Sequence, residues 1–260
     1  MYRPGAIGDT ILTLPALAAL RAHYPGCRIT YAGNAAMLPL LPVEEVLSAD
    51  DRRLLPLFEE PPRMWAEFDL AVSFSKVAFG LQRHPLEAAR RVVHVADWLV
   101  DGIDSTFPDR TPRLQVAPRD SADLVLLPGA GSLAKRWPAE RFAALARAVG
   151  GRVALVVGPA DEDAIAAVLA CGIEADVWRG LTLAELAIRL AGSGLVIGND
   201  SGITHLAASV GTPTLGLYVS TNPGIWGIRG ARTRRLSGMD IRVEEVVSNG
   251  TAIAAKQPGC

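Results

Sequence analysis

The C-terminal half of the chain alternates between short apolar runs and amphipathic stretches. Four apolar runs predict buried strands, at residues 123–128, 152–157, 194–199 and 213–219, and a shorter strand is expected around Val177. Helical spacing of apolar residues marks the stretches 138–150, 161–172, 182–194 and the segment after Asp200. Strand and helix thus alternate about every dozen residues or fewer, which predicts the α/β class with a doubly wound parallel sheet.

The N-terminal half is less regular. Helical periodicity extends from Thr10 to Tyr24, with Pro15 either close to the first turn or at a kink, and residues 28–34 and 69–74 read as strands. The stretch 107–122 breaks the pattern with three prolines and five charged residues. We therefore expect an interdomain linker there, and two domains spanning 1–115 and 116–260.

Composition and charge narrow the class of protein. The chain has 260 residues, 50% hydrophobic and 20% charged, and a net charge of -1 gives no electrostatic reason to expect a nucleic-acid partner. The three cysteines are scattered without CxxC spacing, which argues against a disulfide framework or zinc site. No apolar run reaches membrane-spanning length and no signal peptide is evident, so a cytoplasmic location is expected. These observations are also compatible with a protein that acts at a membrane surface.

Three loops carry the candidate chemistry: "RPGAIGDT", "LPGAGSLAKRWP" and "IGNDSGITH". Each follows, or should follow, a strand and precedes a helix. In an open α/β sheet such loops lie at the carboxyl ends of the strands, where ligands bind.

The third loop predicts an anion site. Asp200 or Ser201 can cap the following helix, Gly202 removes side-chain bulk, and the free N–H groups of the first turn point outward. His205 lies one turn further and shares a face with Ser201. The alternative is that Asp200 and Ser201 merely cap and that His205 is a surface histidine.

The second loop offers Gly129, Gly131 and Ser132 for close approach of the backbone to a ligand, followed by Lys135. A lysine just after such a turn can reach a phosphate, and it can equally be solvated. The spacing GxxxxGK[ST] of a P-loop is absent.

In the first loop, Asp9 is either an N-cap for the helix from Thr10 or a functional carboxylate. Four isolated histidines and the lack of a carboxylate triad argue against a catalytic metal, and the GxSxG elbow of serine hydrolases is absent.

Taken together, "RPGAIGDTILTLPALAALRAHYPGCRITYAGN", "LPGAGSLAKRWPAERFAAL" and "IGNDSGITHLAASVGTPTLGLY" resemble glycosyltransferase family 9, the heptosyltransferase family, in order and spacing. The resemblance implies the GT-B architecture, in which two Rossmann-like domains face each other across a cleft. It also implies transfer of a sugar, with inversion, from a nucleotide diphosphate donor. The best-known members build the inner core of lipopolysaccharide from ADP-heptose.

The resemblance also assigns roles to residues. Asp200, Ser201, Gly202 and His205 match the donor-binding motif, so the helix N-terminus would hold the pyrophosphate of the nucleotide sugar. Lys135 matches the lysine that contacts the same donor.

The remaining matches to the family concern single residues. Ser132 and Gly131 lie where the family often has threonines, and Glu162 is a candidate for the nucleoside by position alone. Asp9 matches the aspartate proposed as catalytic base, which would take the proton of the acceptor hydroxyl. Such a reaction needs no metal and no cofactor beyond the nucleotide sugar itself.

The partners implied are a nucleotide sugar donor and a glycan or lipid-linked acceptor, with peripheral contact at the inner membrane a further option. Only Met1 and Tyr2 precede the first loop, so we expect the first strand to be missing or cut short, which leaves open a start codon further upstream. The segment after "YAGN", which would select the acceptor, is short for the family, so the N-terminal domain is expected to be reduced.

Two alternatives to an inverting heptosyltransferase remain. One is a degenerate nucleotide-sugar-binding protein without turnover, and the other is a GT-B epimerase or hydrolase that acts on the nucleotide sugar alone. The nucleotide base, the sugar, the acceptor and the oligomeric state are left open.

Overall fold

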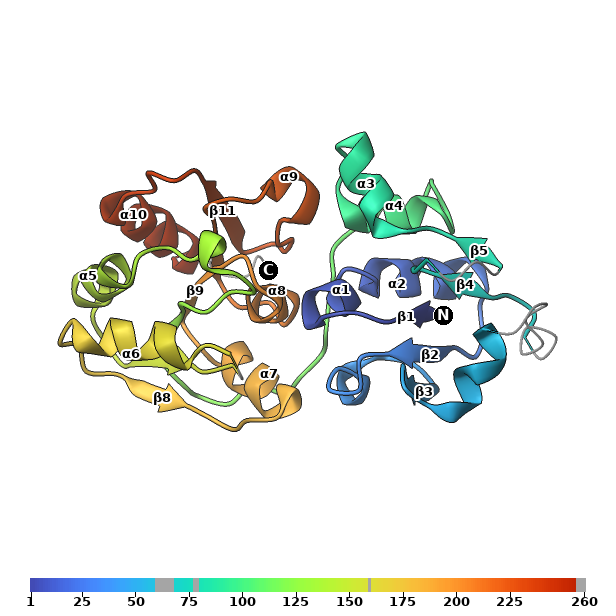
Figure 1. The fold of residues 1–260 in the computed structure, drawn as a ribbon, viewed down its shortest axis with the longest axis horizontal. Helices are drawn as coiled ribbons and strands as arrows, with labels where there is room; N and C mark the ends of the chain where they lie inside the picture. The colour runs from blue at the N-terminus through green and yellow to red at the C-terminus, as the bar shows by residue number, and fades with distance from the viewer. Residues whose placement is uncertain (59–67, 77–79, 159, 256–260) are drawn as a thin grey trace. The chain divides into compact units, whose positions relative to one another are not determined.

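The computed structural model describes residues 1–58, 68–76, 80–158 and 160–255, and the chain divides into two units, Met1–Pro112 and Arg113–Cys260. Each unit has its own sheet of parallel strands with connecting helices (Figure 1). The predicted α/β class with two Rossmann-like domains is confirmed.

The sheet of the C-terminal unit has the strand order of a Rossmann fold. The strand order is β8-β7-β6-β9-β10-β11, and neighbouring strands are parallel. In chain order this is 3-2-1-4-5-6, so the direction of winding reverses between β6 and β9. The strands are β6 (Leu124–Leu127), β7 (Val153–Val156), β8 (Asp176–Trp178), β9 (Leu195–Asn199), β10 (Thr214–Tyr218) and β11 (Thr233–Ser237).

The helices of this unit form two groups. The first group is α5, α6 and α10, in which α5 packs against the other two helices. The second group is α7 and α8, which pack against each other. Right-handed crossovers on either side of the reversal place such groups on opposite faces of the sheet. The bounds are α5 (Ala139–Val149), α6 (Glu162–Ala170), α7 (Leu183–Ala191), α8 (Gly202–Ser209), α9 (Pro223–Trp226) and α10 (Val243–Ala254).

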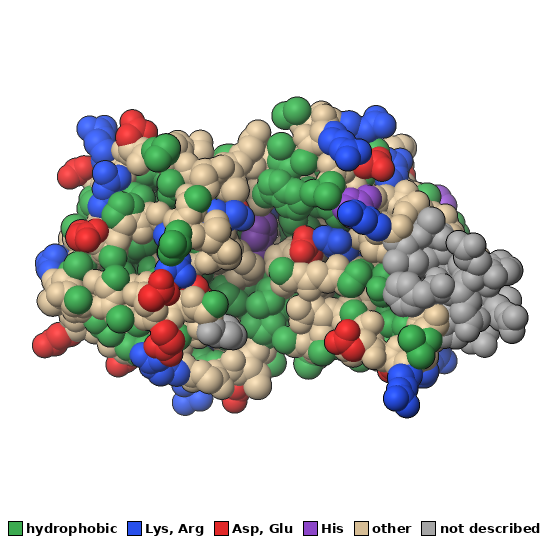
Figure 2. Space-filling model, in the orientation of Figure 1, with side chains coloured by type: hydrophobic (Ala, Val, Ile, Leu, Met, Phe, Trp, Pro, Cys, Tyr) green, Lys and Arg blue, Asp and Glu red, His purple; other side chains and the backbone are tan. Residues whose placement is uncertain are grey.

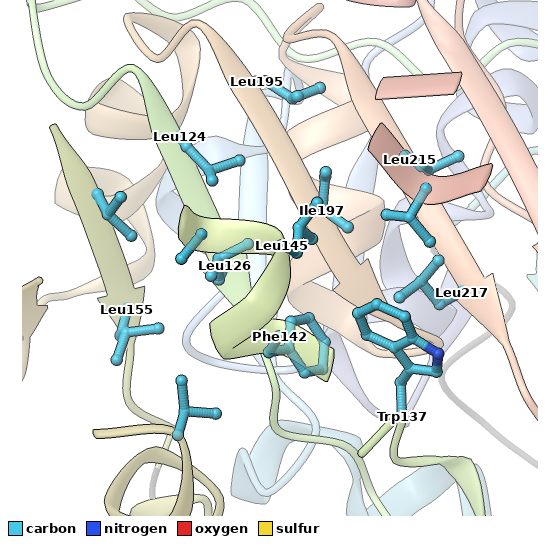
Figure 3. Close-up of a cluster of buried hydrophobic side chains, with 14 of the residues drawn as sticks. Leu124, Leu126, Trp137, Phe142, Leu145, Leu155, Leu195, Ile197, Leu215 and Leu217 are labelled. Atoms are coloured by element: carbon cyan, nitrogen blue, oxygen red, sulfur yellow. The ribbon is translucent and has the colours of Figure 1, made fainter. Parts of the chain in front are cut away.

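The core under α5 is built from alternate residues of the strands. Leu124, Leu126, Leu195 and Ile197 are almost fully buried and meet Phe142 of α5 (Figure 3). Because the intervening residues of β6 and β9 are also buried, both faces of the sheet are covered, as expected for parallel strands. Burial of each large apolar side chain contributes about 1.5–3 kcal/mol.

Trp137 links this core to the loop after β6. Its ring lies edge-on to Phe142, with 5.1 Å between the ring centroids, and its indole N–H donates to the carbonyl of Ile241 at 3.0 Å. A fully buried tryptophan with its N–H paired is well fixed. The end of the second loop is therefore anchored by packing.

The N-terminal unit has the strand order β3-β2-β1-β4-β5, again with parallel neighbours. Its winding reverses between β1 and β4. The first strand is present as a two-residue element at the centre of the sheet. The strands are β1 (Tyr2–Arg3), β2 (Thr30–Gly33), β3 (Glu45–Ser48), β4 (Val72–Ser73) and β5 (Leu81–Gln82).

Of the two positions expected for Pro15, the structure has the one in the first turn of a helix, and the periodic stretch from Thr10 to Tyr24 is divided in two. The structure has two helices, α1 (Ile7–Ile11) and α2 (Leu14–His23), and Pro15 lies in the first turn of α2. A proline ring clashes with the carbonyl four residues earlier and lacks an N–H, so the helix ends before it and restarts. The unit also contains α3 (Pro85–Arg91) and α4 (Val95–Asp101).

The segment 35–106, expected to select an acceptor, lies within the described residues except for 59–67 and 77–79.

Within the described ranges, no helix combines the length and apolarity needed to cross a membrane. In that same part of the chain, no group of three or more histidine, cysteine, aspartate or glutamate side chains is arranged to hold a metal ion.

Candidate functional site

Two of the three candidate loops lie side by side in the C-terminal unit. The loop after β6 contains Lys135, and the turn after β9 contains Asp200 and Ser201. Because β6 and β9 are hydrogen-bonded neighbours at the point where the winding reverses, both loops leave the sheet at the crevice where ligands of such sheets bind.

Asn199 joins the two loops. Its side-chain carbonyl accepts from the backbone N–H of Trp137 at 2.9 Å, and its amide donates to the carbonyl of Pro128 at 2.8 Å. The side chain is fully buried. One carboxamide thus satisfies both ends of the loop from 128 to 137 and fixes it to the end of β9. The only sequence signal for this role is an asparagine at the end of an otherwise apolar strand.

Asp200 pairs with Lys135 across these loops. The ammonium of Lys135 lies 2.8 Å from Oδ2 of Asp200, and the hydroxyl of Thr221 donates to the same oxygen at 2.9 Å. The Asp200 side chain is 8% exposed and that of Lys135 is 33% exposed. Lys135 is therefore held beside the turn after β9, and part of its side chain stays exposed. Thr221, which follows β10, is not marked by any sequence motif.

Ser201, rather than Asp200, caps α8. Its hydroxyl accepts from the backbone N–H of Thr204 at 3.4 Å and lies 3.1 Å from the Thr204 hydroxyl, which donates to the carbonyl of Asn199 at 2.6 Å. Gly202 begins the helix. The N–H groups of Gly202 and Ile203 have no acceptor within the helix and carry the positive end of its dipole.

His205 lies one turn beyond this cap. Its backbone N–H donates to the carbonyl of Ser201 at 3.3 Å, and the residue is 6% exposed. The packing under this turn depends on Gly198, where an added Cβ would stand 2.7 Å from both the Leu127 Cβ and the Thr204 hydroxyl. The start of α8 is therefore closely seated on β6 and β9.

The remaining predicted donor residues lie in open positions. An added Cβ at Gly131 would meet nothing within 4 Å, and Ser132 is exposed at the start of the short 3-10 turn Leu133–Lys135. Glu162 begins α6 after β7, where its largely exposed carboxylate pairs with Arg179. The structure thus brings Lys135, Asp200 and Ser201 together and leaves Glu162 with a different partner.

Gly129 has a role that differs from the one predicted. A Cβ at Gly129 would meet the Asp161 carboxyl carbon at 2.1 Å, so the missing side chain makes room for that carboxyl group. Burial raises the pKa of Asp161, and the nearby Arg136, 3.8 Å away, acts in the opposite direction. Asp161 therefore lies between the ends of β6 and β7, and its role is not apparent from sequence spacing.

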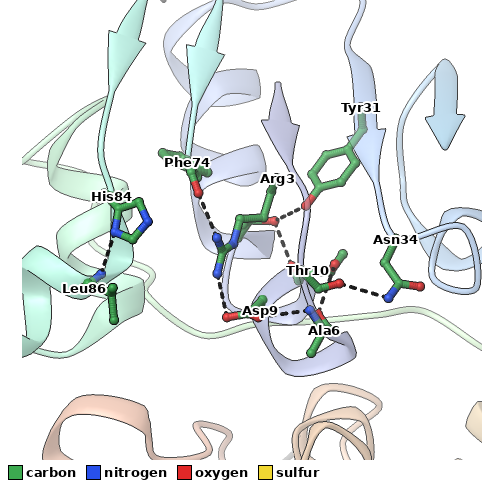
Figure 4. A network of polar contacts seen from close by, with 11 residues as sticks. Arg3, Ala6, Asp9, Thr10, Tyr31, Asn34, Phe74, His84 and Leu86 are labelled. Carbon is green, nitrogen blue, oxygen red and sulfur yellow. Dashed lines mark hydrogen bonds and ion pairs between the residues drawn. The ribbon is translucent and has the colours of Figure 1, made fainter. Parts of the chain in front are cut away.

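The third candidate loop belongs to the N-terminal unit and holds Asp9. This residue is the third of α1, so it is not the N-cap itself. Its Oδ2 accepts from the backbone N–H of Ala6 at 3.0 Å, and its Oδ1 accepts from the guanidinium of Arg3 at 2.6 Å (Figure 4). The side chain remains 28% exposed. The carboxylate therefore stabilises the first turn and still faces outward.

Charged side chains are interspersed elsewhere. On the face drawn in Figure 2, basic and acidic groups alternate over each unit without a large area of one sign. This agrees with the net charge of -1. Attraction of an anionic ligand therefore depends on local groups such as Lys135 and the start of α8.

Much of the chain is similar in sequence to one known protein family. The sequence profile described as glycosyltransferase family 9 (heptosyltransferase) matches residues 81–249. Lipopolysaccharide heptosyltransferase 1 of Pseudomonas aeruginosa is 34% identical over 165 residues, which cover 59% of this chain and 44% of that protein. The protein of the same name from Salmonella typhimurium is 37% identical over 97 residues, 36% of this chain and 31% of its own length. The aligned region thus covers less than half of the length of each of these two relatives.

Solved structures share the fold over nearly the whole chain. E. coli ADP-heptose lipopolysaccharide heptosyltransferase II has a TM-score of 0.77 at 20% identity, covering 97% of both chains. A family 9 glycosyltransferase from Veillonella parvula gives 0.78 at 22%, covering 97% of this chain and 95% of its own. E. coli heptosyltransferase WaaC, solved with ADP, gives 0.73 at 19%, covering 95% and 97%. At these identities the likeness shows the fold alone, and the predicted GT-B architecture is confirmed.

Proposed function

The chain belongs to glycosyltransferase family 9 (heptosyltransferase), and on this basis we propose that it is a glycosyltransferase. Its reaction would move a sugar of the heptose class from a nucleoside diphosphate donor to a lipopolysaccharide-type or other glycan acceptor. ADP-heptose is the proposed donor, because the name of one structural relative includes ADP-heptose and another relative was solved with ADP. With a lipid-linked acceptor, the enzyme would work in the cytoplasm at the inner face of the membrane.

The observation that carries this proposal is the Lys135–Asp200 pair beside the start of α8. An ammonium group has several N–H donors, and Asp200 engages one of them at 2.8 Å. The others, together with the N–H groups of Gly202 and Ile203, form a set of donors suited to a diphosphate. In our proposal Ser201 holds the turn in shape, while Ser132, Gly131, His205 and Glu162 complete the donor site.

The chemistry requires a base and a stabilised leaving group. The acceptor hydroxyl oxygen attacks the anomeric carbon, the bond from that carbon to the diphosphate oxygen breaks, and the configuration inverts. The hydroxyl proton passes to the Asp9 carboxylate, and the electron pair leaves with the diphosphate, whose charge Lys135 and the α8 N-terminus stabilise. This account requires no metal.

Calorimetry with ADP, GDP and UDP sugars tests the donor site, with adenosine as the probe that lacks phosphate. Gly131→Ala is the informative variant, because its added Cβ meets nothing within 4 Å and the fold should be unaffected. If the diphosphate passes over this loop, Gly131→Ala should lower ADP affinity by about 10-fold, or 1.4 kcal/mol. Adenosine binding should stay unchanged, and an equal loss for both ligands would contradict a diphosphate contact.

Turnover is tested by release of the nucleoside diphosphate. We expect release from ADP-heptose that depends on added acceptor. Release without acceptor would favour an epimerase or hydrolase. Donor binding without release for any lipopolysaccharide-type acceptor would instead favour a binding protein without turnover.

A further inference from the structure

Arg3 connects three elements of the N-terminal unit. It ends β1, and its side chain is 10% exposed. Nη1 donates to the carbonyl of Phe74, directly after β4, at 2.9 Å, while Nη2 donates to Oδ1 of Asp9 in α1 at 2.6 Å. Figure 4 shows the guanidinium between these two acceptors. Since β1 and β4 flank the reversal of winding, Arg3 lies at the ligand-binding crevice of this unit.

The surrounding loop is shaped to hold the carboxylate against this guanidinium. An added Cβ at Gly5 would lie 2.8 Å from Oδ2 of Asp9, so only glycine leaves room for the carboxylate in this position. The backbone N–H of Ala6 then holds Oδ2 at 3.0 Å. The two oxygens of Asp9 are thus fixed from two directions by different donors.

The carboxylate of Asp9 keeps capacity to accept a further hydrogen bond. Each carboxylate oxygen can accept more than one hydrogen bond, and each oxygen of Asp9 has one recorded donor among the described residues. The side chain of Asp9 is also 28% exposed. The contacts therefore fix the direction of the group without closing it off.

Other basic groups nearby do not replace Arg3. The pKa of His84 is lowered by burial and by the charges of Arg3 and Lys76, so its imidazole is neutral near pH 7. Its Nδ1 accepts from the backbone N–H of Leu86 at 3.2 Å, which occupies it as the cap of α3. Among the described residues, Arg3 is the basic side chain that forms an ion pair with Asp9.

We propose that Arg3 is a positioning residue, which orients the Asp9 carboxylate toward the acceptor hydroxyl by bridging Asp9 to the carbonyl of Phe74. This rests on the proposed function, in which Asp9 is the base. The planar fork of a guanidinium binds both acceptors at once in fixed directions, whereas the ammonium of a lysine is a point charge. A positive charge at position 3 would therefore not be sufficient to orient the Asp9 carboxylate.

Arg3→Lys separates charge from orientation. Because a displacement of about 1 Å can cost about 100-fold in rate, we expect a loss of 10- to 100-fold in kcat. Donor KM should be unchanged, since the donor-site residues belong to the other unit. Arg21→Lys is a matched control: Arg21 also bridges a backbone carbonyl (Pro42, 2.7 Å) and a carboxylate (Glu44, 2.8 Å), and it should keep wild-type turnover. Melting temperatures of both variants report any general loss of fold.

A double-mutant cycle with Asp9→Asn decides between positioning and a structural role. If Arg3 acts through Asp9, Arg3→Lys should change turnover by less than about threefold once Asp9 is asparagine. Losses that multiply, or a wild-type rate for Arg3→Lys beside an inactive Asp9→Asn, would overturn the proposal for Arg3 alone. An active Asp9→Asn would instead remove Asp9 as base and the Arg3 proposal with it, while acceptor-dependent transfer itself would still be observed.

Discussion

Lys135→Met removes the ammonium of Lys135 and keeps an unbranched apolar stem. At an effective dielectric constant of about 20, opposite charges 2.8 Å apart attract by about 6 kcal/mol. Desolvation offsets much of this, and a hydrogen bond to a charged group contributes about 1.5–3 kcal/mol net. Since Lys135 is 33% exposed, we expect Lys135→Met to lower the free energy of unfolding of the C-terminal unit by about 1–2 kcal/mol. Asp200, 8% exposed, would be left with the Thr221 hydroxyl.

The assay is hydrogen exchange in denaturant, read by mass spectrometry on peptides that cover β9 and α8. Because the chain has two units, a signal assigned to one unit avoids the assumption of a single transition. Arg152→Ala is the control, since it breaks the exposed pairs with Asp120 and Asp123 and should change the exchange of these peptides much less than Lys135→Met does.

The second step adds Asp200→Asn to Lys135→Met. An amide has no charge to leave unpaired, so most of the lost stability should return. The single variant should also bind ADP at least about 10-fold more weakly, because the donors for phosphate are reduced and the Asp200 charge is uncompensated. A single variant as stable as the wild type, or a double variant no more stable than the single, would refute the electrostatic reasoning.

Two further predictions concern the supports of each site. Asn199→Ala leaves the buried Trp137 N–H and Pro128 carbonyl without partners, so it should cost about 2–4 kcal/mol and increase hydrogen exchange in residues 124–138; exchange equal to wild type would contradict the link between the loops. The pKa of His84 is lowered in the folded protein, so the unfolded chain binds a proton on this imidazole more readily. The free energy of unfolding is therefore unaffected by His84 above pH 6.5 and decreases as the pH falls below that value. His84→Asn keeps a capping side chain, so its melting temperature should fall less than that of wild type between pH 7 and pH 5, and an equal fall would exclude His84 as the cause.

Four strands of the C-terminal unit, β6, β7, β9 and β10, are predictable because they are buried on both faces, and their apolar runs show this. β11 is not predictable in this way: "TRRLS" lies at the edge of the sheet and is largely exposed, so it carries no apolar run. α10 is obscured by Gly250, which lowers helix propensity, yet a Cβ there would stand 3.1 Å from Leu195 in the core. Close packing in this case overrides local preference.

The candidate sites are only partly predictable. Loop position and residue type point to Asp9, Lys135 and Asp200, and their roles in the reaction stay predictions. The groups that fix them are distant in sequence: Asn199 binds Pro128 from 71 residues away, and Arg3 reaches Phe74 over the same separation. Spacing along one chain segment carries no information on such partners, which depend on strand order.

The carboxamide of Asn199 also affects how the donor-site crevice can move. Because this one side chain holds the start and the end of the loop from 128 to 137, opening of the loop at either end leaves a polar atom of a fully buried carboxamide without its partner. Such a loss costs about 1–3 kcal/mol. We therefore expect the loop and the end of β9, from which α8 follows, to open as one local unit in hydrogen exchange.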